Sequence, residues 1–242
     1  MCSSWNTSTS TTPRSPGHKD FRLALNYAAD REAILQAVYF GIGSVPNSYM
    51  PKVNFHSDAV PAIPFDIAKA KELVAASGYD GTPVDLMIDS GNATSRQIAT
   101  ILQQGWGEAG INVNIVEFDA GTAWGMVTKL EHTMYVSYIT SDINDTDEIA
   151  TLQADGSSGT NGFFSGYNNP DMKVLLDEAR ASSDPALRAA NYAKVQETLV
   201  YDGYSVPLNF SPLIPGHQAD VMGFKQLSTG FWWLQDVWLD RS

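Results

Sequence analysis

Apolar residues recur with helical periods through the first third of the chain. Residues 21–27 and 31–40 predict two short helices, and Asp30 is placed to cap the second. Residues 44–64 contain several prolines and predict a long extended loop. A third helix is predicted over 67–77. This part of the chain therefore reads as helices joined by one long loop.

Strands and helices alternate in the central part of the chain. Apolar runs predict strands over 84–88, 111–116 and 134–139, and the second of these alternates strictly between apolar and polar residues. Helical periodicity over 95–109 and 122–130 separates them. This order predicts an α/β fold with a mostly parallel sheet and helices on its faces.

The second half of the chain is richer in helical signals. A short helix is predicted over 147–153, and Pro170 and Pro185 each follow a capping residue, which is typical of a helix start. Residues 206–210 resemble a strand. The apolar and aromatic run 231–239 closes the chain, and we find no internal repeat.

The beginning of the chain has a different composition. Residues 1–19 are rich in Ser, Thr and Pro and contain few apolar residues. Such a stretch cannot bury a core, so we expect 1–19 to be a disordered leader.

Composition restricts the classes of partner. The chain has 242 residues, 43% of them hydrophobic, which is enough for a sizeable core. The formal net charge of -12 disfavours nucleic acid as a partner. Cys2 is the single cysteine, so no internal disulfide can form. No apolar run approaches the roughly 18 residues of a membrane helix, and no secretory signal is recognised.

Motifs for cofactors, metals and nucleophiles are weak. The histidines are isolated and form no metal-ligand pattern. Residues 156–159 lack the spacing of a nucleophile elbow, and residues 105–107 lack the frame of a phosphate-binding loop. We therefore predict no cofactor and no metal site, although distant residues can still assemble a Ser/His/Asp site.

The acidic segment after the third predicted strand is the main candidate site. Asp142, Asp145 and Asp147 follow the apolar run 134–139 directly. Side chains at strand carboxyl ends open into the crevice where α/β folds bind small molecules. These carboxylates suit acid/base chemistry, a hard cation or a cationic ligand group. The alternative is that they form a turn and cap the next helix, as Asp and Asn commonly do.

Four segments carry motifs in a particular order. They are Asp20–Ile34, Phe65–Tyr79, Gly166–Ala179, and a helix face with Asp184, Arg188, Tyr192 and Gln196 at every fourth position. Their order and spacing resemble those of the peptide-type (family 5) extracellular solute-binding proteins of ABC importers.

The resemblance implies a periplasmic-binding-protein-like fold (type II, cluster C). It implies that 20–209 form the carboxy-terminal, substrate-binding lobe and that 210–242 return toward a first lobe, which we expect to be absent from this chain. Residues 1–19 match nothing in the family pattern. Because 231–239 would then lack their packing partner, we expect a homodimer.

The resemblance also implies ligand contacts. Thr140 and Asp142 match a "W-T-x-D-x-x-D-P" stretch whose first Asp pairs with the amino terminus of a peptide ligand, and Asp145 matches its second Asp. Ile139 stands where Trp is usual and Thr146 where Pro is usual. The expected ligand-binding residues are Tyr138, Ile139, Thr140, Asp142, Asp145, Asn161 and Phe164.

Two functions follow as hypotheses. The first is the substrate-binding component of an ABC importer, which binds a peptide or similar small solute between lobes and does no chemistry. Its parent protein would be periplasmic or lipid-anchored outside the membrane, with an ABC permease as partner. The alternative is a promiscuous ester hydrolase on the same scaffold, with an open half-cleft lined by Ser, Asp and His.

Overall fold

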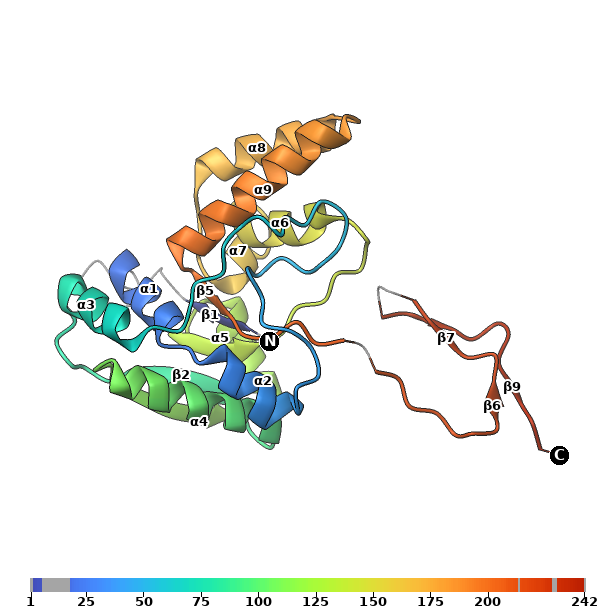
Figure 1. The fold of residues 1–242 in the computed structure, drawn as a ribbon, viewed down its shortest axis with the longest axis horizontal. Helices are drawn as coiled ribbons and strands as arrows, with labels where there is room; N and C mark the ends of the chain where they lie inside the picture. Colours follow the sequence, from blue (N-terminus) through green and yellow to red (C-terminus); the bar gives the residue numbers. More distant parts are fainter. Residues whose placement is uncertain (1, 6–17, 213, 228–229, 242) are drawn as a thin grey trace.

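A five-stranded mixed sheet organises the chain, seen in a computed structural model that describes residues 2–5, 18–212, 214–227 and 230–241 (Figure 1). The strand order is β3-β2-β4-β1-β5. β2 pairs in parallel with β3 and β4, whereas β1 is antiparallel to β4 and β5. Four of the five strands therefore run in the same direction and only β1 is reversed, which confirms the mostly parallel sheet predicted from the sequence. The strands are β1 (Cys2–Trp5), β2 (Val84–Asp89), β3 (Val113–Phe118), β4 (Met134–Ser137) and β5 (Ser205–Pro207).

β1 departs from the expectation of a disordered leader over 1–19. Its residues Cys2–Trp5 lie between β4 and β5 and hydrogen-bond with both. The sequence carried no signal for this strand, because backbone pairing on both sides supplies its contacts and needs no apolar alternation. Residues 6–17 of the expected leader lie outside the described residues.

The helices follow the predicted pattern, with small shifts at their ends. Seven of them are capped by a side chain that accepts a hydrogen bond from a backbone amide of the first turn, namely Asp30, Asp66, Asn92, Asp119, Asp145, Asn169 and Asp184. The short helix α7 was not predicted. The helices are α1 (Lys19–Tyr27), α2 (Arg31–Tyr39), α3 (Ile67–Ser77), α4 (Ala93–Glu108), α5 (Ala120–Thr128), α6 (Thr146–Ala154), α7 (Asn161–Phe164), α8 (Pro170–Ala181) and α9 (Pro185–Asp202).

Three strand predictions need adjustment. The strand expected over 134–139 ends at Ser137, so Tyr138 and Ile139 lie in the loop that follows it. The strand expected over 111–116 begins and ends two residues later, at Val113–Phe118. The strand expected over 206–210 is only Ser205–Pro207, and Phe210 instead forms an isolated bridge with Ser44. The long proline-rich loop therefore pairs with the chain just beyond β5.

Buried residues cover both faces of the sheet. On one face, α1 and α4 pack over the strands in the largest apolar cluster. On the other face, Ala123 and Val127 of α5 pack against Met87 and Tyr135. A separate cluster joins α6, α8 and α9 to Tyr49 and Met50 of the long loop. The helices above the sheet in Figure 1 thus have their own core.

The Gly105–Trp106 pair has a packing role. A Cβ at position 105 would lie 2.3 Å from the Ala28 carbonyl oxygen, so only glycine permits this approach of α4 to the end of α1. The fully buried indole of Trp106 donates a hydrogen bond of 2.9 Å to the Leu25 carbonyl. These residues fix the helix layer over the sheet.

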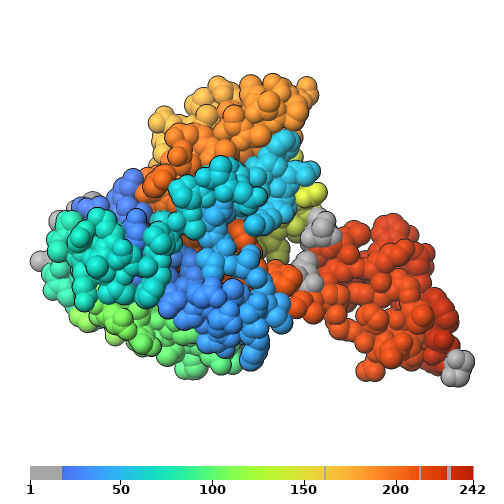
Figure 2. Space-filling view, in the orientation of Figure 1, coloured from blue at the N-terminus to red at the C-terminus, as the bar shows by residue number. Residues whose placement is uncertain are grey.

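The carboxy-terminal segment, residues 211–241 as far as they are described, stands apart from the rest of the chain (Figure 2). β6 (Val221–Met222) pairs with β9 (Trp238–Leu239), and β7 (Lys225–Gln226) pairs with β8 (Trp232–Trp233). Several large apolar side chains of the segment are exposed, namely Phe231, Trp232, Trp233, Leu234, Trp238 and Leu239.

Within the described residues, none of the helices combines the length and the apolar character needed to cross a bilayer.

His132, which precedes β4, is a buried histidine that resists protonation. Its side chain lies edge-on to Tyr135, and neither ring nitrogen has a hydrogen-bond partner among the described residues. Burial lowers the pKa of His132 to about 4. An unfolded histidine has a pKa near 6.5. The folded chain therefore loses stability as the pH falls from about 6.5 toward 4, because only the unfolded state takes up the proton.

We expect His132→Phe to remove this part of the pH dependence. The wild-type chain should lose up to about 1.4 kcal/mol per pH unit through this group over that window. Urea unfolding at several pH values measures how the free energy of unfolding changes with pH. His217→Phe, at an exposed histidine, is the matched control. Equal slopes for His132→Phe and wild type would contradict the assignment.

Candidate functional site

The loop that follows β4 is held in a defined shape by one carboxylate. Glu148 of α6 accepts hydrogen bonds from the Ser141 hydroxyl (3.0 Å) and from the backbone amides of Asp142 (2.8 Å) and Ile143 (3.1 Å). The Ser141 hydroxyl also lies 2.6 Å from the Ile143 carbonyl. The loop backbone is thus anchored to the first turn of α6.

Asp142 is a positioned and unpaired carboxylate. Its backbone amide is bound by Glu148, whereas its side chain is exposed. Within the part of the chain that the structure describes, its carboxylate forms no hydrogen bond or ion pair. It lies at the carboxyl edge of the sheet, just beyond β4, with Thr140 exposed beside it. A carboxylate without a protein partner, on a loop whose backbone is anchored at this edge, suits a cationic ligand group.

Asp145, the other aspartate of the resembling motif, is occupied by the protein itself. It caps α6 by accepting from the Asp147 amide (2.9 Å). Both of its carboxylate oxygens lie 3.0 Å from the Arg188 guanidinium of α9. The turn-and-cap alternative therefore describes Asp145, while Asp142 remains available.

Arg188 is the centre of a packed network. Its guanidinium lies 4.7 Å over the Phe55 ring and donates to the Tyr192 hydroxyl at 3.1 Å. That hydroxyl in turn donates to Asp147, which also pairs with Arg180. The described residues contain no group of three or more His, Cys, Asp or Glu side chains placed to hold a metal ion. Two of the three loop aspartates thus serve to dock α6 on α9.

A small apolar pocket lies beside this loop, at the carboxyl ends of β4 and β5. Half-buried Ile139 forms one wall, and Leu208 and Phe210, just beyond β5, form another. Pro46 and Tyr49 of the long loop complete it, with about 60 Å³ of space for water-sized molecules. No charged side chain lines it.

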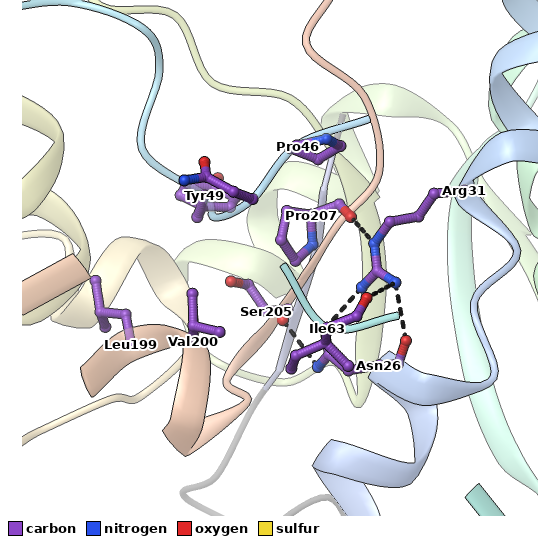
Figure 3. A pocket seen from close by; sticks show the side chains of 10 residues that line it. Asn26, Arg31, Pro46, Tyr49, Ile63, Leu199, Val200, Ser205 and Pro207 are labelled. Carbon is purple, nitrogen blue, oxygen red and sulfur yellow. Dashed lines mark hydrogen bonds between the residues drawn. The ribbon is translucent and has the colours of Figure 1, made fainter. Parts of the chain in front are cut away.

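A second pocket surrounds the Arg31 guanidinium (Figure 3). Arg31 donates to the Pro207 carbonyl (2.7 Å), the Ile63 carbonyl (3.2 Å) and the Asn26 side chain (3.0 Å). The remaining space of about 10 Å³ holds one water molecule at most. This pocket ties α1 and α2 to β5, and it is too small for a solute.

The carboxyl edge contains further polar and aromatic groups that the sequence did not single out. Asp89, the last residue of β2, accepts a hydrogen bond of 2.8 Å from the Tyr135 hydroxyl. Burial and this carboxylate raise the pKa of Tyr135, so the hydroxyl stays protonated. Asp89 directly follows the apolar run 84–88 in the sequence, and the same kind of signal selected Asp142. Exposed Trp124 of α5 had no such signal.

The other expected ligand contacts are dispersed. Tyr138 is 69% exposed on the loop. Phe164 has a left-handed backbone (φ 60°) and packs edge-on against Trp124, with ring centroids 5.1 Å apart. No ring contact or hydrogen bond among the described residues joins Phe164 to the Asp142 loop. Asn161 begins α7, and its side chain lies outside the described residues.

The hydrolase alternative gains no support from this arrangement. Among the described residues, no serine hydroxyl is hydrogen-bonded to a histidine ring. His132 is buried away from the loop residues, and His217 contacts the Gln218 carbonyl. Nucleophilic catalysis needs a hydroxyl within hydrogen-bond reach of its base.

The chain folds as an α/β domain with an exposed carboxylate at the carboxyl edge of its sheet. Residues 6–161 match the profile of the bacterial extracellular solute-binding proteins, family 5 (middle region). Because this match covers well over half of the chain, the chain belongs to that family. The match begins at residue 6, so it includes residues 6–19 of the segment that we expected to lie outside the family pattern.

Individual relatives bear different ligand names. The chain is 28% identical over 220 residues to heme-binding protein A of Haemophilus influenzae, covering 87% of this chain and 40% of that protein. It is 29% identical over 221 residues to a dipeptide-binding protein of Pseudomonas aeruginosa, covering 86% of this chain and 41% of that protein. The chain thus spans about two fifths of the length of these relatives.

A solved structure shows the same architecture. The periplasmic binding protein DppA of Helicobacter pylori, associated with an ABC transporter and solved with the peptide STSA, superposes with a TM-score of 0.87 at 25% identity. The match covers 99% of this chain and 46% of that protein. The fold is therefore that of part of a cluster C periplasmic binding protein, as the sequence predicted.

The different environments of the two aspartates lead to a stability prediction. We expect Asp145→Asn to lower the free energy of unfolding by about 1–3 kcal/mol, because a half-buried ion pair with Arg188 is lost. Asp142→Asn should change it by less than about 0.5 kcal/mol, because its carboxylate is exposed and unpaired. Urea unfolding at pH 7 compares the two; equal losses would contradict the distinction.

Proposed function

We propose that this chain is the ligand-binding lobe, residues 20–209, of the substrate-binding component of an ABC importer. Its ligand is a peptide or a similar small solute with a free ammonium group. The observation that carries the proposal is Asp142, an exposed carboxylate on a loop fixed by Glu148 at the carboxyl edge of the sheet. Family membership and the peptide complex of the Helicobacter pylori protein support it.

Charge favours one of the ligand groups that the names of the relatives suggest. Their names include both heme and dipeptides, so the names alone select no ligand. An unpaired carboxylate attracts an ammonium group and repels a carboxylate. We therefore favour an amino-terminal ammonium group as the part of the ligand nearest Asp142.

In the whole protein, closure of a second lobe would remove water from this contact and strengthen it. The closed form would then be presented to a membrane permease, in the periplasm or on the outer surface of the cell. The protein would act by binding and would need no cofactor.

The ammonium contact is tested with a simple peptide. We expect millimolar Ala-Ala-Ala to shift the backbone amide resonances of the Asp142 loop in the 242-residue chain, measured by NMR. N-acetylation of the peptide or Asp142→Asn should weaken binding by about two- to fivefold, since an exposed charge pair contributes up to about 1 kcal/mol.

Asp171→Asn is the matched control. It removes the same charge from an exposed position in the first turn of α8 and should leave binding unchanged. Equal affinity of Asp142→Asn and wild type, or equal affinity of the free and acetylated peptides, would refute the proposal.

We further propose that residues 210–242 pack against another lobe in the whole protein. This segment carries exposed aromatic side chains and has a counterpart in the Helicobacter pylori structure, of which this chain covers less than half. Exposed apolar patches of this kind mark protein contacts.

For the 242-residue chain by itself, we expect the same patch to pair with a second copy. Light scattering should report a dimer at high concentration, and Trp232→Ser combined with Phe231→Ser should shift it to monomer, because both side chains are more than half exposed. Phe40→Ser, at another exposed aromatic side chain outside the segment, is the control and should remain dimeric. A wild-type monomer would contradict this expectation.

A further inference from the structure

The pocket beside Ile139 is separate from the carboxylate that binds the ammonium group. Its lining is mostly apolar, with Ile139 after β4, Leu208 and Phe210 after β5, and Tyr49 in the long loop, and it also includes the polar residues Ser48 and Asn209. It contains no charged side chain. Burial of an apolar group in such a pocket stabilises the complex, whereas burial of a charged group destabilises it.

The walls of the pocket are fixed. Leu208 and Tyr49 are buried, and Phe210 is bonded through its backbone to Ser44 in both directions, at 2.9 and 3.1 Å. Ile139 packs against the cluster that α6, α8 and α9 form. Closely packed walls do not collapse onto empty space, so the room is available to a ligand.

The size of the pocket limits what enters it. The free space is about 60 Å³. A cavity of roughly 150 Å³ is known to take a benzene ring. The Ile139 pocket therefore suits an isopropyl or isobutyl group and excludes an aromatic side chain.

The position of the pocket links it to the ligand. Ile139 and Asp142 are three residues apart on one loop, so their Cα atoms lie within about 11 Å. This limit keeps the pocket within reach of a short peptide whose ammonium group lies at Asp142.

We propose that this pocket is a specificity subsite for a branched aliphatic side chain of a peptide ligand. The proposal rests on the peptide-binding function assigned to Asp142. The pocket selects valine-sized or leucine-sized side chains at one position of the peptide, because such side chains fit the walls around Ile139.

The test compares four tripeptides binding to the 242-residue chain: Ala-Ala-Ala, Val-Ala-Ala, Ala-Val-Ala and Ala-Ala-Val. We expect one valine position to bind about tenfold more tightly than Ala-Ala-Ala, because two more carbon groups are buried. Phenylalanine at that position should bind no better than alanine.

Ile139→Trp should fill the pocket. It should abolish the valine preference, so that the valine-containing peptides bind no more tightly than Ala-Ala-Ala. Ile143→Trp is the matched control, because Ile143 lies in the same loop, is 48% exposed and does not line the pocket. It should keep the preference.

The outcomes separate the two proposals. If all four peptides bind equally and depend on Asp142, the subsite is refuted and the ammonium site stands. If no peptide binds, both the ammonium site and the subsite are refuted for peptide ligands.

A second measurement probes the pocket alone: isobutanol should shift the Leu208 methyl resonances in wild type and in Ile143→Trp, but not in Ile139→Trp. Unchanged Leu208 resonances in wild type would also overturn the subsite.

Discussion

The parallel pairing of β2 with β3 and β4 is the constraint on which the site depends. Parallel strands deliver their carboxyl ends to one edge of a sheet, so the segments that follow them must meet there. Asp89 ends β2, and the Asp142 loop and Ile139 follow β4. β5 runs in the same direction, because both it and β4 are antiparallel to β1, and it brings Leu208 and Phe210 to this edge. The polar and apolar parts of the site are neighbours for this reason.

The helical layer converts this edge into a defined surface. Glu148 at the start of α6 holds the backbone of the Asp142 loop, while Asp145 and Arg188 dock α6 on α9. Thr146 adds hydrogen bonds from its amide and hydroxyl to the Asn54 carbonyl, at 3.1 and 2.7 Å. These bonds tie the long loop to α6 and, through Glu148, to the Asp142 loop. A preorganised carboxylate loses less conformational entropy on binding than a mobile one.

Residues that share a motif have separate tasks in this fold. Asn26 and Arg31, from the first motif, join α1 and α2 to the backbone around β5 (Figure 3). Arg188 and Tyr192, from the last, complete the network around Asp145 and Asp147. Gln196 bonds in both directions with the Ser57 backbone. These motif residues hold the scaffold together, whereas Asp142 is exposed at the edge of the sheet and Ile139 lines the pocket beside it.

The amino-acid sequence by itself determined the α/β order, the helix caps and the segment that carries the site, because periodicity and capping are local properties. Local signals did not reveal β1, since its contacts come from β4 and β5, which lie far away in the sequence. They also did not distinguish Asp142 from Asp145, because both are aspartates after a strand. Only the tertiary structure placed Arg188 against one of them and left the other unpaired. It likewise formed the Ile139 pocket, whose walls come from three distant segments that folding brings together.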